Sequence, residues 1–441
     1  MDDRRQLPIV AIVGRPNVGK STFFNRILRR RKAVVLGTPG VTRDRNYGVA
    51  EWRDRSFLLI DTGGYDTAET ATLTTLVREQ CLLAVEEADV VVFLVDVRES
   101  VSPVDHEVAE MLRRTGKPVF LAVNKCDAPS HENSAAEFYR FGLERLFAVS
   151  AEHGHGVAEL LDSLVEVLPP SRAAEPTDDT AVRIAVVGRQ NVGKSTLVNR
   201  LLGAPRVIAD ETPGTTRDAI DVPFERGGRR YVLVDTAGIR RRGKIARGVE
   251  RLSVTSAIVS LERCDVALIV LDAAAGIVDQ DAHIAGYASE AGRACVLLVN
   301  KWDLVEKDSS TADHYAELIR RELRFLAFAP ILFVSATTGQ RVAKILDTVE
   351  ALLPQFRCRI ETSALNEALG KSLKRHSPPV VRGRTLRIKY VTQTATAPPT
   401  FTLFVNDPQL MHFSYKRYLV NQFRERFSLD SVPIRLRLRH K

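Results

Sequence analysis

The sequence predicts an α/β protein built from two similar domains, each a mostly parallel sheet with helices on both faces, followed by a smaller α+β domain. Three observations support this fold class. Apolar runs of strand length alternate with stretches of helical spacing, which favours a parallel sheet. A glycine-rich motif begins at Gly14 and again 174 residues later, at Gly188. The last 87 residues of the 441 have a different, strongly basic pattern.

The bulk composition is typical of a globular protein, with 45% hydrophobic and 27% charged residues. The N-terminal residues lack the apolar core of a signal peptide. The longest apolar runs, such as Val90–Val95 and Val266–Leu271, have the length of strands and are too short to span a membrane. Five scattered cysteines without paired spacing indicate reduced thiols. We therefore expect a cytoplasmic protein that does not act in a membrane.

The first domain is expected at residues 1–168. Its predicted strands are 8–13, 57–60, 90–95, 118–123 and 145–149, and its predicted helices are 20–29, 72–87, 104–114 and 156–167. A polar, proline-containing linker is expected at 169–181. The second domain is expected at 182–354, with strands at 183–187, 231–234, 266–271, 295–299 and 331–334 and its end at Pro354. A repeat this long indicates a duplicated domain rather than a solenoid.

The third domain is expected at residues 355–441. Helices are predicted at 360–372 and 415–427, and strands at 385–391, 401–405 and 434–438. It contains 17 Lys and Arg against 5 Asp and Glu, a balance of +12, whereas the rest of the chain has 46 against 49. This asymmetry favours a nucleic-acid partner for the third domain, and the alternative is a basic solubilising surface.

The duplicated motif predicts two phosphate-binding loops. Each copy follows an apolar run and precedes a stretch of helical spacing, which is the context of a Walker-A loop. Backbone amides and the helix dipole would hold the phosphates, with Lys20 and Lys194 adding charge. The hydroxyls of Ser21 and Ser195 would bind Mg²⁺. The expected nucleotide contacts are Gly14, Arg15, Pro16, Asn17, Val18, Gly19, Lys20, Ser21 and Thr22, and Gly188, Arg189, Gln190, Asn191, Val192, Gly193, Lys194, Ser195 and Thr196.

Two further motifs recur at the same offset of 174 residues. The loops 38–44 and 212–218 contain Thr42 and Thr216, which could supply a second Mg²⁺ ligand and sense the γ-phosphate. The motifs Asp61-Thr62-Gly63-Gly64 and Asp235-Thr236-Ala237-Gly238 follow, or stand at the end of, apolar strands. Their aspartates suit Mg²⁺ binding, and the amides of Gly64 and Gly238 could bond the γ-phosphate.

A fourth motif selects the base. Asn124-Lys125-Cys126-Asp127 and Asn300-Lys301-Trp302-Asp303 each follow an apolar strand, and Ser150-Ala151 and Ser335-Ala336 come after them. A carboxylate facing two N–H donors prefers guanine, because adenine lacks that pair of donors. The sequence therefore predicts two sites for guanine nucleotides.

The paired motifs resemble those of the translation-factor-related GTPases, and two such domains before a basic tail resemble the Der (EngA) family. The tail segments 390–393, 398–401 and 414–419 are also similar to that family. The resemblance implies two P-loop GTPase domains and a KH-like C-terminal domain, with GTP, GDP and Mg²⁺ as ligands. It further implies a bacterial GTPase that acts in assembly of the large (50S) ribosomal subunit and contacts rRNA. We also expect the protein to be a monomer.

The residue after the Asp-x-x-Gly motif is a water-orienting glutamine in Ras-like enzymes, but Tyr65 and Ile239 stand there in this chain. One interpretation is that both sites are inactive. The resemblance implies another, in which Asn17 and Asn191 are linked to a bound K⁺ that assists slow, partner-stimulated hydrolysis. On that interpretation the catalytic residues are Asn17, Lys20, Thr42 and Gly64 in the first domain, and Asn191, Lys194, Thr216 and Gly238 in the second.

The tail lacks the Gly-x-x-Gly loop with which KH domains clamp RNA, since its glycines are Gly370 and Gly383. RNA contact would then use Arg382, Arg384, Arg387, Lys389, Lys416 and Arg417, which could equally cover a protein interface. The charge run 239–244 is either a solvated loop or a nucleotide-gated phosphate contact. Two other functions stay open: a tRNA-modifying GTPase, disfavoured because the last cysteine is Cys358, and a non-catalytic RNA-binding scaffold.

Overall fold

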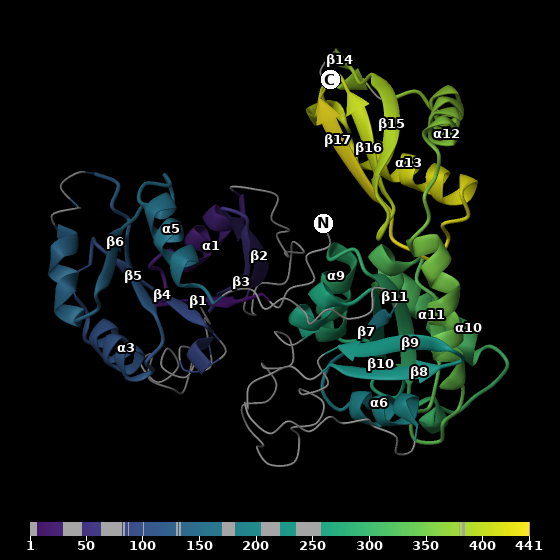
Figure 1. Ribbon diagram of the computed structural model, residues 1–441, viewed down its shortest axis with the longest axis horizontal. Helices are drawn as coiled ribbons and strands as arrows, with labels where there is room; N and C mark the ends of the chain where they lie inside the picture. Colours follow the sequence, from purple (N-terminus) through teal and green to yellow (C-terminus); the bar gives the residue numbers. More distant parts are fainter. Residues whose placement is uncertain are drawn as a thin grey trace. The chain divides into compact units, whose positions relative to one another are not determined.

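The chain folds into two compact units, residues 1–176 and 177–441, each described here by itself (Figure 1). The structure is a computed structural model, and it describes residues 7–29, 46–62, 82, 84–86, 88–99, 101–128, 131, 134–169, 181–203, 221–234, 257–378, 380–381 and 384–440. Within these ranges no helix is long and apolar enough to cross a membrane.

The first unit contains a six-stranded sheet in the order β2-β3-β1-β4-β5-β6. Its strands are β1 (Ile9–Val13), β2 (Asn46–Trp52), β3 (Arg55–Asp61), β4 (Val90–Asp96), β5 (Val119–Asn124) and β6 (Arg145–Ala148). All pairings are parallel except that of β2 with β3. The helical elements are α1 (Lys20–Arg29), α3 (Pro103–Arg114), η1 (Ala136–Phe141) and α5 (Val157–Val167).

Both faces of this sheet are buried, as its nearly continuous apolar strands predict. One core cluster joins alternate strand residues such as Ile12 with Phe23 of α1 and Leu160 of α5. The other joins Val13 with Leu112 of α3 and with Phe138 and Phe141 of η1. Helices α1 and α5 therefore cover one face of the sheet and α3 covers the other (Figure 1). The loops that follow β1, β4 and β5 leave the sheet at its carboxyl edge.

The second unit repeats this sheet, in the order β12-β11-β10-β7-β9-β8. Its strands are β7 (Val182–Val187), β8 (Val222–Arg226), β9 (Arg229–Val234), β10 (Val266–Asp272), β11 (Ala294–Asn300) and β12 (Ile331–Phe333). The helical elements are α6 (Lys194–Leu202), α9 (Asp279–Glu290), η2 (Trp302–Leu304), α10 (Thr311–Glu322), η3 (Arg324–Leu326) and α11 (Ala343–Phe356). As in the first unit, β8 pairs antiparallel with β9 and the other pairings are parallel.

The C-terminal domain is a small α+β domain with a three-stranded sheet, β15 (Ile388–Ala395), β16 (Thr400–Val405) and β17 (Arg435–His440). β15 is antiparallel and β17 parallel to β16. Its other elements are α12 (Thr362–Arg375), β13 (Val380–Val381), β14 (Arg384–Thr385), η4 (Pro408–Leu410) and α13 (Phe413–Arg426). Phe401 and Leu403 of the sheet pack on Leu369 of α12 and Phe423 of α13 in one buried cluster.

This cluster is continuous with one face of the second sheet, where it includes Val349 and Phe356 of α11. Helix α11 runs through Pro354 and ends at Phe356, two residues beyond the expected end of the domain. A proline inside a helix removes one backbone hydrogen bond and is costly, and the burial of Leu352, Leu353 and Phe356 around it offsets that cost. The third domain and the domain built on the second sheet thus share a core.

Candidate nucleotide-binding sites

The two phosphate loops have the same backbone conformation. In the first loop, Gly14, Asn17 and Gly19 have φ values of 148°, 66° and 98°. The equivalent residues of the second loop, Gly188, Asn191 and Gly193, have 150°, 59° and 95°. In both loops the intervening valine, Val18 or Val192, is buried and anchors the loop to the core. The agreement indicates that the motif alone determines this turn.

Glycine is required at Gly19 and Gly193 for a steric reason as well. A Cβ atom on Gly19 would collide with the side-chain amide of Asn124, and one on Gly193 would collide with that of Asn300. Both positive φ values are also costly for residues with a side chain. The base-recognition motif therefore lies directly against the phosphate loop in each domain.

The loop lysines and the first serine are placed for phosphate and metal chemistry. Lys20 Nζ donates to the carbonyls of Gly14 and Arg15 at 2.9 and 2.7 Å, and Lys194 makes the equivalent bonds in the second loop. Ser21 Oγ donates to Asp61 Oδ2 at 2.8 Å. A hydroxyl and a carboxylate that meet in this way are the hard oxygen donors that Mg²⁺ prefers. These two residues thus fit the metal that the motif implies.

The motif asparagines connect three segments of each site. Asn124 Nδ2 donates to Val18 O at 2.8 Å, and its Oδ1 accepts from Ala151 N at 2.9 Å. Asn300 does the same with Val192 O at 2.7 Å and Ala336 N at 2.9 Å. Both asparagines are 2% exposed. Each asparagine therefore joins the phosphate loop to the Ser-Ala segment and positions both. The sequence predicted a nucleotide contact for these asparagines, and this positioning role is additional to it.

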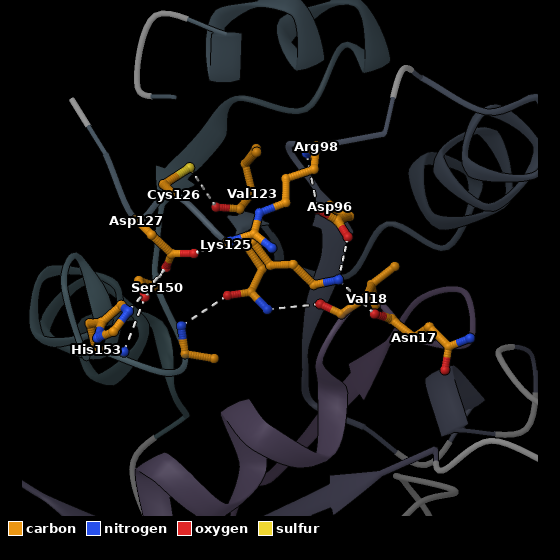
Figure 2. Close-up of polar contacts among 12 residues, drawn as sticks. Asn17, Val18, Asp96, Arg98, Val123, Lys125, Cys126, Asp127, Ser150 and His153 are labelled. Carbon is orange, nitrogen blue, oxygen red and sulfur yellow. Dashed lines mark hydrogen bonds and ion pairs between the residues drawn. The ribbon is translucent and has the colours of Figure 1, made fainter. Parts of the chain in front are cut away.

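The motif lysines are held by aspartates that the sequence motifs do not include. Lys125 Nζ lies 2.5 Å from Asp96 Oδ2 and donates to Asn17 O at 3.0 Å (Figure 2). In the second domain Lys301 Nζ lies 2.6 Å from Asp272 Oδ2. Asp96 and Asp272 end β4 and β10, so the parallel sheet brings them to the edge where the motifs lie. Burial raises the pKa of Asp272, but the bonds from Lys301 and two backbone amides outweigh it and leave that pKa lowered.

The two carboxylates predicted to bind guanine differ in their surroundings. Asp127 Oδ1 accepts from Ser150 Oγ at 2.6 Å, and Asp127 Oδ2 accepts from Arg98 Nη2 at 2.6 Å (Figure 2). The bond from Ser150, helped by the charge of Arg98, lowers the pKa of Asp127, so the group is ionised. Asp303 is exposed and forms no ion pair within the described ranges.

A second pair of carboxylates, also absent from the motifs, holds the arginine of each phosphate loop. Arg15 Nε lies 2.8 Å from Asp105 Oδ1, and its Nη1 lies 2.9 Å from Glu99. Arg189 Nε lies 3.3 Å from Asp281 Oδ2. Burial raises the pKa of both Asp105 and Asp281, and the arginines offset that effect only in part. Asp105 and Asp281 lie in the first turns of α3 and α9, so each loop is tied to a neighbouring helix.

Several predicted site residues lie outside the described residues. They are Thr42, Gly63 and Gly64 in the first domain, Thr216, Asp235, Thr236, Ala237 and Gly238 in the second, and the charge run 239–244. Tyr65 and Arg382 lie outside as well. The remaining motif residues come together at the carboxyl edge of each sheet, where Thr62 Oγ1 donates to Ile12 O of the central strand at 2.9 Å.

These features define a class: a P-loop GTPase with two guanine-nucleotide sites in tandem and a KH-like C-terminal domain. A family model described as 50S ribosome-binding GTPase matches residues 9–125 and 183–301. A model described as the C-terminal KH-domain-like region of EngA bacterial GTPase enzymes matches residues 359–439.

Curated relatives match nearly the whole chain. GTPase Der of Geotalea daltonii is 51% identical over 97% of both chains, and GTPase Der of Caldanaerobacter subterraneus is 50% identical over 97% of both. Among solved structures, the G domain of the T. maritima FeoB iron transporter is 28% identical, with a TM-score of 0.28, and covers 36% of this chain and 98% of that one. The chain belongs to the Der (EngA) family of GTPases. It binds GTP and GDP and hydrolyses GTP.

Proposed function

We propose that this GTPase is a switch in assembly of the large ribosomal subunit, with its nucleotide state controlling contact with rRNA. The observation that carries the proposal is that two guanine sites of equal loop geometry are joined to a KH-like domain. A protein that only hydrolysed GTP would need neither the duplication nor a tail with a charge of +12. The domain boundaries that we propose are 168, 181 and 354, and we propose a monomer in the cytoplasm.

The ligand roles follow from the donor groups. Ser21 with Asp61, and Ser195 with Asp235, would hold Mg²⁺ together with Thr42 and Thr216 from the loops that precede them. When bound, Mg²⁺ supplies positive charge at the β- and γ-phosphates. Asn17 and Asn191 project from positive-φ positions in exposed parts of the loops, where their side-chain oxygens could help to bind K⁺. Slow hydrolysis that K⁺ and a partner accelerate is consistent with Tyr65 and Ile239 in place of glutamine.

The switch itself would use the loops around residues 38–44, 61–64, 212–218 and 235–238, closing on GTP and relaxing after hydrolysis. The ribosome-binding description of the matched GTPase model supports an RNA-containing partner. On the KH-like domain, the exposed cations Arg384, Arg387, Lys389, Lys416 and Arg417 would contact rRNA phosphates. A tRNA-modifying activity is not supported by Cys358, because partial burial raises the pKa of that thiol and makes it less reactive.

The test is co-sedimentation of the purified protein with large ribosomal subunits in GDP and in a non-hydrolysable GTP analogue, over a range of KCl and NaCl concentrations. We expect markedly stronger binding in one nucleotide state, with an affinity that falls steeply with salt. Equal binding in GDP and in the analogue would contradict the switch. Binding to tRNA but not to subunits would favour the tRNA-modifying alternative.

A further inference from the structure

In the first domain, the carboxylate that is predicted to bind guanine, Asp127, already forms an ion pair with Arg98. Arg98 follows β4 and its Nη2 donates to Asp127 Oδ2 at 2.6 Å, while Ser150 occupies Oδ1 (Figure 2). His153 Nε2 lies 4.0 Å from the same Oδ1. The side chain of Asp127 is 18% exposed and that of Arg98 is 55% exposed. The arginine therefore covers a carboxylate that would otherwise face solvent.

The second domain has the same backbone but not the same side chain. Arg98 N donates to Asp96 Oδ1 at 3.0 Å, and Ala274 N donates to Asp272 Oδ1 at 3.0 Å, so the two residues occupy equivalent positions in the turn. Likewise His153 N and Thr338 N each donate to the motif serine at 3.1 Å. The second site thus has alanine and threonine where the first has arginine and histidine.

We propose that Arg98 is an internal competitor of guanine, so that the first site binds guanine nucleotides more slowly and more weakly than it would without this arginine. Guanine must donate N1–H and an N2–H to the carboxylate, and the Arg98 guanidinium offers a similar pair of donors to it. The proposal rests on the assignment of Asp127 as the guanine-binding residue. At the second site the equivalent residue is Ala274, and no cation among the described residues pairs with Asp303.

The expected size of the effect follows from the exposure of the pair. Exposed ion pairs contribute little, so releasing the Arg98 pair should change guanine affinity by about two- to five-fold rather than by orders of magnitude. Added salt weakens an exposed pair further, so the difference should shrink as ionic strength rises.

The experiment uses the full-length chain with Asp303→Asn, which replaces the guanine-binding carboxylate of the second site so that fluorescently labelled GDP reports mainly on the first. Arg98→Ala is then compared with Arg114→Ala, which removes the same charge from an exposed i,i+4 pair with Glu110. We expect Arg98→Ala to lower Kd by about two- to five-fold, mostly through faster association, because Asp127 is then free to bind in a larger fraction of the molecules. We expect Arg114→Ala to leave Kd unchanged. The reciprocal test places Ala274→Arg in an Asp127→Asn chain, where we expect weaker GDP binding at the second site.

Three outcomes are distinguishable. Tighter binding only in Arg98→Ala supports competition. Unchanged or weaker GDP binding in Arg98→Ala overturns it, because the arginine is then inert or binds the nucleotide itself. If the Asp303→Asn chain shows no preference for GDP over ADP at its remaining site, the assignment of Asp127 fails, and with it the proposed function of the first domain.

Discussion

At the scale of single residues, the asparagine of the base motif does most to hold each site together. Asn124 and Asn300 each satisfy a buried carbonyl of the phosphate loop and a buried amide of the Ser-Ala segment. Three segments that are far apart in sequence are thereby fixed through one side chain. The motif therefore stabilises the structure of the site, in addition to its predicted role in recognising the base.

Asn124→Ala should reduce both stability and nucleotide binding. The substitution leaves Val18 O and Ala151 N buried without their partner, and each such group costs about 1–3 kcal/mol. We expect the first unit to lose about 2–4 kcal/mol, measured by denaturant unfolding, and to lose GDP binding at that site. Asn300→Ala should do the same to the second unit and leave the first unit unchanged. If a variant lost GDP binding but kept its full stability, the hydrogen bonds of this asparagine would not contribute to stability.

Removing the carboxylates that hold the loop arginines should affect the two domains unequally. After Asp105→Ala, Arg15 keeps Glu99 as an ion-pair partner. In the second domain the position equivalent to Glu99 is Ala275, whose side chain cannot pair with Arg189 after Asp281→Ala. Breaking a buried pair by removing one partner costs about 3–5 kcal/mol. Since both arginines are about one-fifth exposed, we expect about 2–3 kcal/mol for Asp281→Ala and less for Asp105→Ala. Thermal unfolding of the variants measures both, and equal losses would contradict the role of Glu99.

Local motifs indicate the candidate loop residues because the chemistry of these residues depends on short spacing. They did not indicate Asp96, Asp105, Asp272 or Asp281, which meet the motifs only through the sheet. A signal was present, however. These aspartates recur as pairs at an offset of 176 residues, so aligning the two halves of the chain would have identified them.

At the scale of elements, the buried parallel strands were predicted within one or two residues because both faces are apolar. The edge strands β2 and β8 were missed. They pair antiparallel at the sheet edge, and β8 shows only one buried position among its five. In β2 the buried residues include Tyr47, Gly48 and Ala50, which form no apolar run. In the tail, the predicted strand 385–391 is divided between β14 and β15, with a register shift between Ile388 and Tyr390. Side-chain pattern alone does not reveal such an irregularity.

Asp308 offers an element-scale test at the start of α10. Its Oδ1 accepts from the amides and hydroxyls of Ser310 and Thr311, and these bonds lower its pKa to about 2. A lowered carboxyl pKa stabilises the folded state above about pH 4, and this contribution is lost as the pH falls towards 2. We expect Asp308→Ala to speed amide hydrogen exchange in the first turn of α10 at pH 6.

The matched control is Asp308→Asn, which keeps an acceptor but carries no charge. In this variant the amides in the first turn of α10 should exchange at a rate between those of the wild type and Asp308→Ala. Below pH 4, the stability of this turn should depend less on pH than in the wild type. If the amides in the first turn of α10 exchanged at the same rate in all three proteins at pH 6, the Asp308 side chain would not stabilise the start of this helix.

At the scale of the whole molecule, the second unit is larger than a GTPase domain because the KH-like domain shares its core. Arg435 of β17 donates to the carbonyl of Glu290 at the end of α9, and Arg424 of α13 lies over the ring of Phe328 at 4.8 Å. The sequence predicted three domains from composition and periodicity. It could not predict this fusion, because the contacts join residues more than 90 positions apart.

Glu290 makes stability of this unit dependent on pH. Burial raises its pKa to about 7 from 4.5, and its Oε2 has no hydrogen-bond partner among the described residues. The folded state therefore holds the proton more tightly than the unfolded chain, and stability is lost as the pH rises from about 4.5 through 7. We expect Glu290→Gln to match the wild type near pH 4.5 and to exceed it by about 1–2 kcal/mol at pH 8, allowing for partial exposure.

The measurement is unfolding of the full chain followed at several pH values. Because the two domains of this unit share a core, the gain should appear in a single transition that includes the KH-like domain. A difference between the chains that does not vary with pH would contradict the assignment to Glu290.

The two halves of the chain also preserve a history of their divergence. Equivalent residues lie 174 positions apart up to the Asp-x-x-Gly motif, 176 apart at Asp96 and Asp272, and 185 apart at Ser150 and Ser335. The last and largest gain falls where the first domain has η1 and the second has α10 followed by η3. The difference in length thus lies in a segment away from the phosphate loops, whose described residues keep the same conformation in both domains. Each version of this surface segment exposes an aromatic ring, Tyr139 of η1 in the first domain and Phe325 of η3 in the second, 59% and 41% exposed.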